Sequence, residues 1–241
     1  MGGHSGGLEL PRLWCRQGRL LHGRDQQAVT AGGTVDEVTV RPETTSPFKS
    51  AVTSLMRTTI LDALHSLLLE HTWSNVNMTD VAKTAGVSRQ TLYKEFGTRK
   101  GLAQGYALRL TDTFVSAVDS AIYANENDSL RTLYLAFTQF FGRSASDPLV
   151  LSILTDDPPP DLLRLVTTES GILLEHAASR LAETFEHSWI RASPHNADVL
   201  GRAIVRLALS YISMPPSNSA DVAADMALLL APFVDTVKDS A

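Results

Sequence analysis

The stretch MTDVAKTAGVSRQTLYKEFGTRKGL, residues 78–102, decides the fold of this chain. It predicts two short helices joined by a tight turn at Gly86, because glycine adopts positive φ without a Cβ clash. Thr79 and Ser88 are placed to cap these helices, since a hydroxyl accepts from the free N–H groups of a first turn. The pattern is typical of a helix-turn-helix, whose second helix enters the major groove of DNA. The expected helices run from about Thr79 to Ala85 and from about Ser88 to Phe96.

The outward residues of the second helix are all hydrogen-bonding types, and none is acidic. Arginine and glutamine make bidentate pairs with base edges, a threonine methyl contacts the thymine methyl, and tyrosine and lysine suit phosphate oxygens. Basic residues at the start of the next helix also favour a phosphate. Two surface helices with solvated charges are the alternative, but the caps, the small Ala82, the turn glycine and the polar face coincide here. The predicted DNA-binding residues are Thr79, Ser88, Arg89, Gln90, Thr91, Tyr93, Lys94, Arg99 and Lys100.

The segment GVSRQTLYKEFGTRKGLAQGY, residues 86–106, resembles the DNA-binding end of TetR-family (AcrR-like) transcriptional regulators. That family favours G-V-S-x-x-T-L-Y-x-x-F followed by a short cap and a basic residue, and the match covers about residues 48–106. One departure is Gly97-Thr98-Arg99, where the family more often has Pro-Ser-Lys, and Lys100 replaces a commonly acidic residue. The resemblance implies an all-α fold, in which an N-terminal three-helix helix-turn-helix DNA-binding domain precedes a larger C-terminal helical ligand-binding and dimerisation domain.

The net charge of −5 separates into parts of opposite sign. Residues 47–105 carry seven basic and four acidic side chains, a net charge of +3, whereas residues 106–241 carry nine and seventeen, a net charge of −8. The cationic part is the predicted DNA-binding domain, as phosphate binding requires, and residues 106–241 form the predicted ligand-binding and dimerisation domain. Residues 1–46 contain glycine pairs and lack periodicity, which predicts a disordered N-terminal extension. Whether these residues contact DNA as an arm, or lie upstream of the natural start, stays open.

Several classes of protein are disfavoured. A single cysteine, Cys15, excludes an internal disulfide, and no run of about 18 apolar residues appears, so a cytoplasmic protein without a membrane span is expected. The chain has no H-E-x-x-H or C-x-x-C motif and no phosphate-cradling glycine loop. We therefore expect no enzyme activity, no catalytic residue, no metal site and no cofactor.

Apolar residues recur at helical spacing along the chain from about residue 48, and no sustained two-residue alternation appears. Ser129 is placed to cap one of the expected helices. The helices outside the quoted stretch are expected at about 48–73, 98–124, 129 onward, 149–154, 161–187, 196–213 and 219–237.

Apolar and aromatic side chains on at least three helices of the larger domain suggest a pocket between helices, although for any one of them an ordinary core position is the alternative. The predicted ligand-binding residues are Leu133, Phe137, Phe140, Phe141, Leu151, Leu154, Leu165 and Ile172. Four polar residues are candidates for a ligand head group or, alternatively, for surface solvation: Arg131, Gln139, Arg143 and Arg164.

The last two expected helices present broad apolar faces. The resemblance implies that these helices pair with those of a second copy, and the alternative is that they close the chain's own core. A dimer is favoured because a single helix-turn-helix reads few bases, whereas a dimer spans two half-sites. The predicted interface residues are Ala203, Ile204, Leu207, Tyr211, Met226, Leu229 and Phe233.

These features predict a transcriptional regulator that binds double-stranded DNA as a homodimer. The resemblance implies a repressor that an apolar small molecule, such as a fatty acid or ester, releases from a palindromic operator, as in actinobacterial members that control lipid metabolism or export. A drug-responsive efflux regulator is one alternative, and a helical lipid-binding carrier without DNA binding is another. A carrier has no use for Arg89, Gln90 and Lys94 on one helix face.

Overall fold

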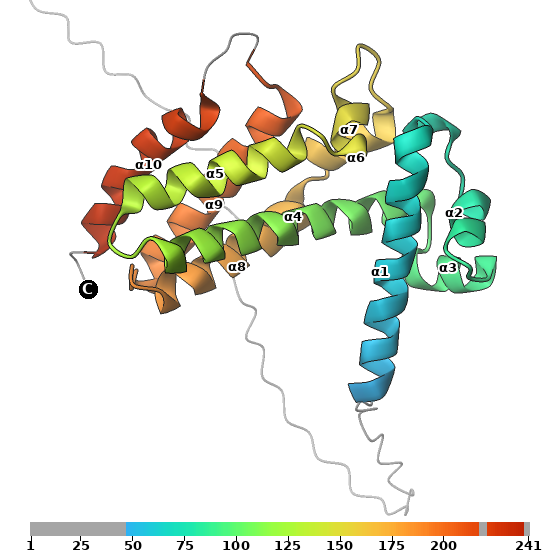
Figure 1. The fold of residues 1–241 in the computed structure, drawn as a ribbon, viewed down its shortest axis with the longest axis horizontal. Helices are drawn as coiled ribbons and strands as arrows, with labels where there is room; N and C mark the ends of the chain where they lie inside the picture. Colours follow the sequence, from blue (N-terminus) through green and yellow to red (C-terminus); the bar gives the residue numbers. More distant parts are fainter. Residues whose placement is uncertain (1–46, 217–220, 239–241) are drawn as a thin grey trace, which may run out of the picture. The chain divides into compact units, whose positions relative to one another are not determined.

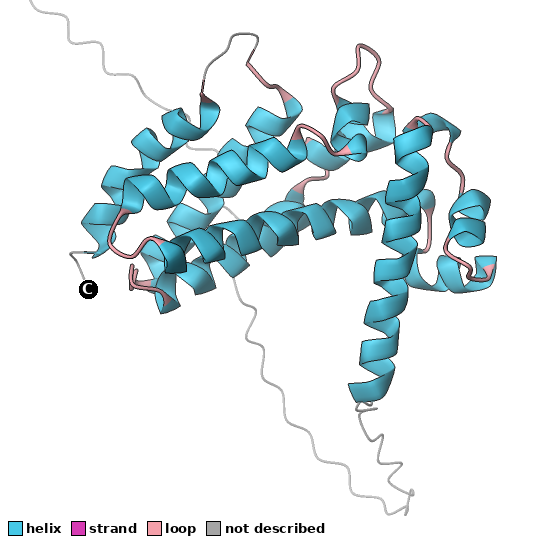
Figure 2. Cartoon of the chain, in the orientation of Figure 1, coloured by secondary structure: helices cyan, strands magenta, loops and turns pink. Residues whose placement is uncertain are grey.

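A computed structural model describes residues 47–216 and 221–238, and within these ranges the chain consists of helices and loops (Figures 1 and 2). The all-α prediction is therefore confirmed. The disordered extension predicted for residues 1–46 lies outside the described residues. None of the helices in the described part combines the length and the hydropathy needed to cross a bilayer.

Three helices form the DNA-binding end: α1 (Pro47–Glu70), α2 (Met78–Thr84) and α3 (Arg89–Phe96). Ser88 caps α3 as predicted, because its hydroxyl accepts from the Thr91 N–H at 3.0 Å. Gly86 adopts a φ of 68°, which confirms the turn. The Thr79 cap is wrong: α2 begins one residue earlier, and the Asn77 side chain accepts from the Thr79 N–H at 2.9 Å. Asparagine is at least as good a cap as threonine, and Thr79 lies inside the first turn.

Helix α4 (Arg99–Ala124) connects the two parts of the fold, and Thr98 caps it through the Gly101 N–H at 3.0 Å. Figure 1 shows α4 leaving the end that holds α1, α2 and α3 and continuing beside α5 and α8. Its first turns bury Leu102 and Tyr106 in a core shared with the helix-turn-helix. Its later turns bury Phe114 and Ile122 in the core of the larger helical part. A shift of α4 therefore moves side chains in both cores.

The larger part is built from helix pairs. Helix α8 (Gly171–His187) packs on α9 (Pro194–Ser213), and α5 (Ser129–Ser144) packs on α10 (Val222–Lys238). Gly201 permits the first of these contacts, since a Cβ at this position would lie 2.7 Å from the carbonyl oxygen of Ala178. This small residue therefore serves helix packing within the chain.

Two expectations on helix boundaries are wrong. Residues 161–187 form two helices, α7 (Pro160–Val166) and α8, because hydroxyl side chains between them bond locally to the backbone. Thr167 donates to the Leu163 carbonyl at 2.7 Å and Ser170 to the Thr167 carbonyl at 2.8 Å. The cap of α5 is Asp128, which accepts from the Arg131 N–H, and not Ser129.

Helix α6 (Pro148–Ile153) is short and lies near the predicted 149–154. Asp147 caps it, accepting from the Leu149 and Val150 N–H groups at 2.9 and 3.2 Å. Leu149 and Ile153 on this helix join the same core cluster as residues of α1, α2 and α3. Helix α6 is therefore a second element, besides α4, that contacts both parts of the chain.

Candidate nucleic-acid interface

The exposed face of α3 carries the predicted base-reading residues. Arg89, Gln90 and Lys94 are exposed, and Tyr93 is 43% exposed. The opposite face is anchored, since Leu92 and Phe96 are buried in the core. Thr91 is half-buried, and its hydroxyl lies 2.8 Å from that of Ser88. The structure therefore brings the predicted residues of α3 together on one polar face.

Helix α3 is held in position by α1 and α4. The Arg57 guanidinium of α1 donates to the Glu95 carbonyl at 2.9 Å, lies 3.6 Å from the Glu95 carboxylate and stacks over the Phe96 ring at 4.5 Å. Gly105 of α4 lies so close that a Cβ there would be 2.6 Å from the Phe96 ring. These contacts fix the tilt of the reading helix on the rest of the fold.

Three cations of this end form no ion pair with any residue in the described ranges: Lys83, Arg89 and Lys94. All three are exposed, so their charge is available to phosphate oxygens. Together with the hydrogen-bonding side chains of α3, they form a surface suited to the edge of a duplex.

Two of the predicted phosphate contacts are engaged elsewhere. The Arg99 guanidinium stacks over the Trp73 ring at 4.1 Å, donates to the Trp73 carbonyl and lies 3.6 Å from the Asp161 carboxylate of α7. The Trp73 indole N–H in turn donates to Asp161 at 2.9 Å. Lys100 lies 2.6 Å from the Glu169 carboxylate. The geometry therefore does not support these cations as free phosphate ligands, because acidic residues that are distant in the sequence neutralise them.

The predicted ligand-binding residues separate into three groups. Phe140 and Leu165 line an apolar cavity of about 80 Å³ between α4 and the helices α5 to α9. Phe141 and Leu154 line a different cleft of about 370 Å³, near the start of α10. The others lie outside both hollows: Leu133 and Phe137 are core residues, and Leu151 and Ile172 are exposed.

Several residues that line the apolar cavity were missed. Phe114 of α4 lines it, and so do Leu149 and Ile153 of α6. None of the described residues that line this cavity is charged. Helical periodicity separates inward from outward residues, but it does not say which inward residues face a void.

The predicted interface residues also divide. Ile204 and Met226 are 0% and 1% exposed in the single chain, so their assignment to an interface between copies is wrong. They pack in the core that α8 and α9 share with α5 and α10. Ala203, Leu207 and Tyr211 are half-buried, whereas Leu229 is 65% exposed and Phe233 is 36% exposed. Of the seven predicted interface residues, the two that are exposed, Leu229 and Phe233, lie on α10.

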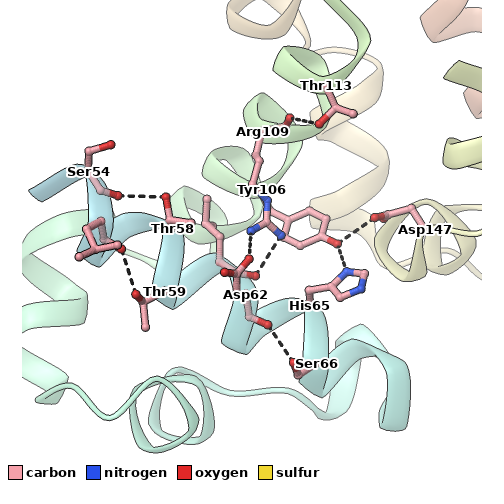
Figure 3. A network of polar contacts seen from close by, with 12 residues as sticks. Ser54, Thr58, Thr59, Asp62, His65, Ser66, Tyr106, Arg109, Thr113 and Asp147 are labelled. Atoms are coloured by element: carbon pink, nitrogen blue, oxygen red, sulfur yellow. Dashed lines mark hydrogen bonds and ion pairs between the residues drawn. The ribbon is translucent and has the colours of Figure 1, made fainter. Parts of the chain in front are cut away.

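A polar network joins α1, α4 and the start of α6 (Figure 3). The buried Tyr106 hydroxyl donates to the Asp147 carboxylate at 2.8 Å and lies 2.6 Å from His65 Nδ1. Since the phenol proton is directed at Asp147, His65 must donate its Nδ1–H to the phenol oxygen. Arg109 stacks over the Tyr106 ring at 4.7 Å and donates to Asp62 at 2.6 Å.

Burial raises the pKa of the Tyr106 phenol well above its ordinary value, and the neighbouring Asp147 carboxylate raises it further. The hydroxyl therefore stays protonated and keeps its donor role at any physiological pH. We call the three residues His65, Tyr106 and Asp147 the joint, because each comes from a different part of the fold.

A capped helix-turn-helix with a polar, cation-bearing second helix, connected by one long helix to a bundle with an apolar cavity, defines a DNA-binding transcriptional regulator. A family model described as bacterial regulatory proteins, tetR family, matches residues 60–105, and one described as bacterial tetracyclin repressor, C-terminal domain, matches residues 128–232. The chain belongs to the TetR family of bacterial regulatory proteins.

Named relatives agree with this assignment. The HTH-type transcriptional regulator AlkX of Mycobacterium tuberculosis is 48% identical over 197 residues, covering 82% of this chain and 93% of that protein. The solved structure of the TetR family repressor AlkX from Dietzia, implicated in biodegradation of n-alkanes, is 39% identical, has a TM-score of 0.71 and covers 76% of this chain and 96% of its own. Thermus thermophilus FadR, solved with lauroyl-CoA, is 19% identical with a TM-score of 0.50 over 73% of this chain and 93% of its own, which shows a shared fold alone.

Proposed function

We propose that this regulator is a homodimeric repressor, which binds a palindromic operator through α3 of each copy and is released by an apolar small molecule such as a fatty acid or ester. The Dietzia relative is a repressor implicated in n-alkane biodegradation, and its 39% identity supports a related role here. As a bacterial DNA-binding protein, it would act in the cytoplasm, where the chromosome lies.

The observation that carries the DNA-binding part of the proposal is the exposed face of α3. Arg89 and Gln90 project from a helix whose inner face is buried, and Arg57 fixes that helix from behind. A bidentate arginine or glutamine contact discriminates a base by about 1–3 kcal/mol. Two such helices on a two-fold axis would read two half-sites one helical turn apart or a multiple of it.

The exposed apolar side chains of α10 support the dimer. Leu228 and Leu229 are 70% and 65% exposed, and Phe233 on the next turn is partly exposed. Covering large apolar side chains contributes about 25 cal/mol for each Å² removed from water. Isologous pairing of this helix with its copy would cover the same residues on both chains.

The lining of the cavity supports an apolar ligand. Since none of the described residues in the wall is acidic, the cavity offers no ion pair to a cationic drug, whereas each buried CH₂ of an acyl chain contributes about 0.8 kcal/mol. At about 80 Å³ the cavity is smaller than the roughly 300–1,000 Å³ of typical ligand sites. A long chain must therefore separate helices to enter, and α4 is one of them.

The need to separate helices suggests how the ligand would weaken DNA binding. A ligand that fits only a widened cavity prefers the conformation in which α4 has moved, and it shifts the population toward that conformation. Because α4 also packs on α3, that shift changes the spacing of the two reading helices. Ligand and operator then weaken each other's binding by the same factor.

The test is a titration of a complex between the regulator and a fluorescein-labelled operator, recovered from genomic fragments that the protein retains. Laurate and palmitate are expected to lower the anisotropy and to raise the thermal stability of the free protein. A cationic dye serves as the control and is expected to do neither. Release by the dye alone, with neither lipid bound, would contradict the proposed ligand class.

A further inference from the structure

A second hollow adjoins the apolar cavity. A cleft of about 280 Å³ opens between α1, α4 and α5, and its lining combines apolar residues with polar ones that include His65, Arg143 and Asp147. The cleft and the cavity share three lining residues: Leu110, Phe140 and Ser144. An elongated molecule that passes this shared wall would have one end among polar groups and the other among apolar side chains.

Arg143 supplies a positive charge at the edge of the cleft. Arg143 is exposed, and within residues 47–216 and 221–238 its guanidinium forms no ion pair. The neighbouring carboxylate, Asp147, is already satisfied, because it accepts from the Tyr106 hydroxyl and from two backbone N–H groups at the start of α6. The cleft therefore has an arginine without an ion pair among the described residues, beside a carboxylate that already accepts three hydrogen bonds.

The other hollow that shares lining residues with the cavity lacks this property. It is the cleft near the start of α10, and of the described residues that line it only Asp221 is charged. That opening disfavours an anion, because none of these residues is a cation that could compensate the lost hydration. A carboxylate head group is therefore better accommodated beside Arg143.

We infer that the cleft between α1, α4 and α5 is the head-group subsite for an aliphatic carboxylate, with Arg143 as its charged partner and the chain passing Leu110, Phe140 and Ser144 into the apolar cavity. The inference rests on the proposed ligand control and adds to it the charge and the position of the head group. An arginine binds a carboxylate through two parallel N–H···O bonds, which gives both affinity and orientation.

The subsite also lies against the joint. His65 and Asp147 line the cleft and hydrogen-bond Tyr106, so a head group at this place contacts residues that tie α1 and α6 to α4 (Figure 3). A second carboxylate beside Asp147 places like charges close together, which weakens the hold of Asp147 on the start of α6. The aliphatic chain of the ligand would widen the cavity, while its carboxylate would weaken the contacts of Asp147 in the joint.

The experiment compares laurate with dodecanol, which has the same chain and an uncharged head. For each, the concentration that releases half of the labelled operator is measured with the wild type, Arg143→Gln and Arg131→Gln. Arg131 is the matched control, because it is an exposed arginine of the same helix that does not line the cleft. Hydrogen exchange of the α6 amides is measured with and without laurate.

The expected result is that Arg143→Gln raises the half-release concentration of laurate by at least about tenfold, the loss of one charge-assisted pair, and leaves dodecanol unchanged. Laurate should speed exchange at Leu149 and Val150 in the wild type, but not in this variant at the same concentration. An equal effect of Arg131→Gln would overturn the inference, because it would indicate a general loss of positive charge.

Two further outcomes separate the inference from the proposed function. If laurate releases the operator from Arg143→Gln at the same concentration as from the wild type, the head-group subsite is overturned. The proposed control by fatty acids would still stand. If neither laurate nor dodecanol binds the wild-type protein or releases the operator, the proposed ligand class and the subsite both fail.

Discussion

Replacing Tyr106 with Phe removes one hydroxyl from the joint and little else. The ring is buried, and its stacking on His65, at a centroid distance of 6.2 Å, and beneath Arg109 is retained by phenylalanine. What is lost is the 2.8 Å bond to Asp147 and the acceptor that His65 Nδ1 reaches at 2.6 Å.

The expected loss of stability follows from these two hydrogen bonds. A hydrogen bond to a charged group contributes about 1.5–3 kcal/mol and a neutral one about 0.5–1.5 kcal/mol. Asp147 retains two backbone donors, so its loss lies at the lower end of the range. We expect the free energy of unfolding to fall by about 2–3 kcal/mol and the Tm by about 4–12 °C for a chain of this size.

Chemical denaturation and calorimetry measure the loss of stability, and Tyr123→Phe is the matched control because Tyr123 is 58% exposed.

The stability of the wild type should also depend on pH in the alkaline range. The raised pKa of Tyr106 favours the protonated folded state, so its contribution is complete below the unfolded value of about 10 and is lost as the pH rises through the folded value. An alkaline absorbance titration should show one late-titrating phenol, which Tyr106→Phe removes. The assignment of the joint would be refuted if Tyr106→Phe were as stable as Tyr123→Phe and still showed the late-titrating phenol.

Further predictions concern DNA binding and assembly. Arg89→Ala should weaken operator binding by about 1–3 kcal/mol and relax the preference at one base pair, measured by anisotropy on a panel of operator variants. Lys94→Ala should lower the salt slope of binding by about one unit on any duplex, whereas Arg99→Ala should leave the slope unchanged and lower the Tm, because its cation is already paired. Leu229→Asp should weaken the dimer by at least about 2 kcal/mol, measured by sedimentation equilibrium, while Leu163→Asp, at a 40% exposed position on α7, keeps the wild-type mass. An unchanged mass for Leu229→Asp would remove α10 from the interface.

The helix-turn-helix could be predicted from the sequence because its signals are local. The turn at Gly86 and the caps at Ser88 and Thr98 depend on backbone groups within three residues, so residue type and spacing are sufficient. The same reasoning misplaced the cap of α2 by two residues, because Asn77 and Thr79 are both good capping residues. The polar face of α3 was also predictable, since helical periodicity assigns each residue to one side.

What only the tertiary structure decided is which partner each side chain meets. Periodicity placed Ile204 on an apolar helix face that was assigned to the dimer interface, but its packing within the chain, and not against a copy, depends on where α8 and α10 lie. The sequence predicted Arg99 as a phosphate ligand, but in the fold it pairs with Asp161, which is distant in the sequence. The joint is similar, because 41 residues separate His65 from Tyr106 and another 41 separate Tyr106 from Asp147. Long-range contacts of this kind depend on helix packing, and the identities of single residues do not encode them locally.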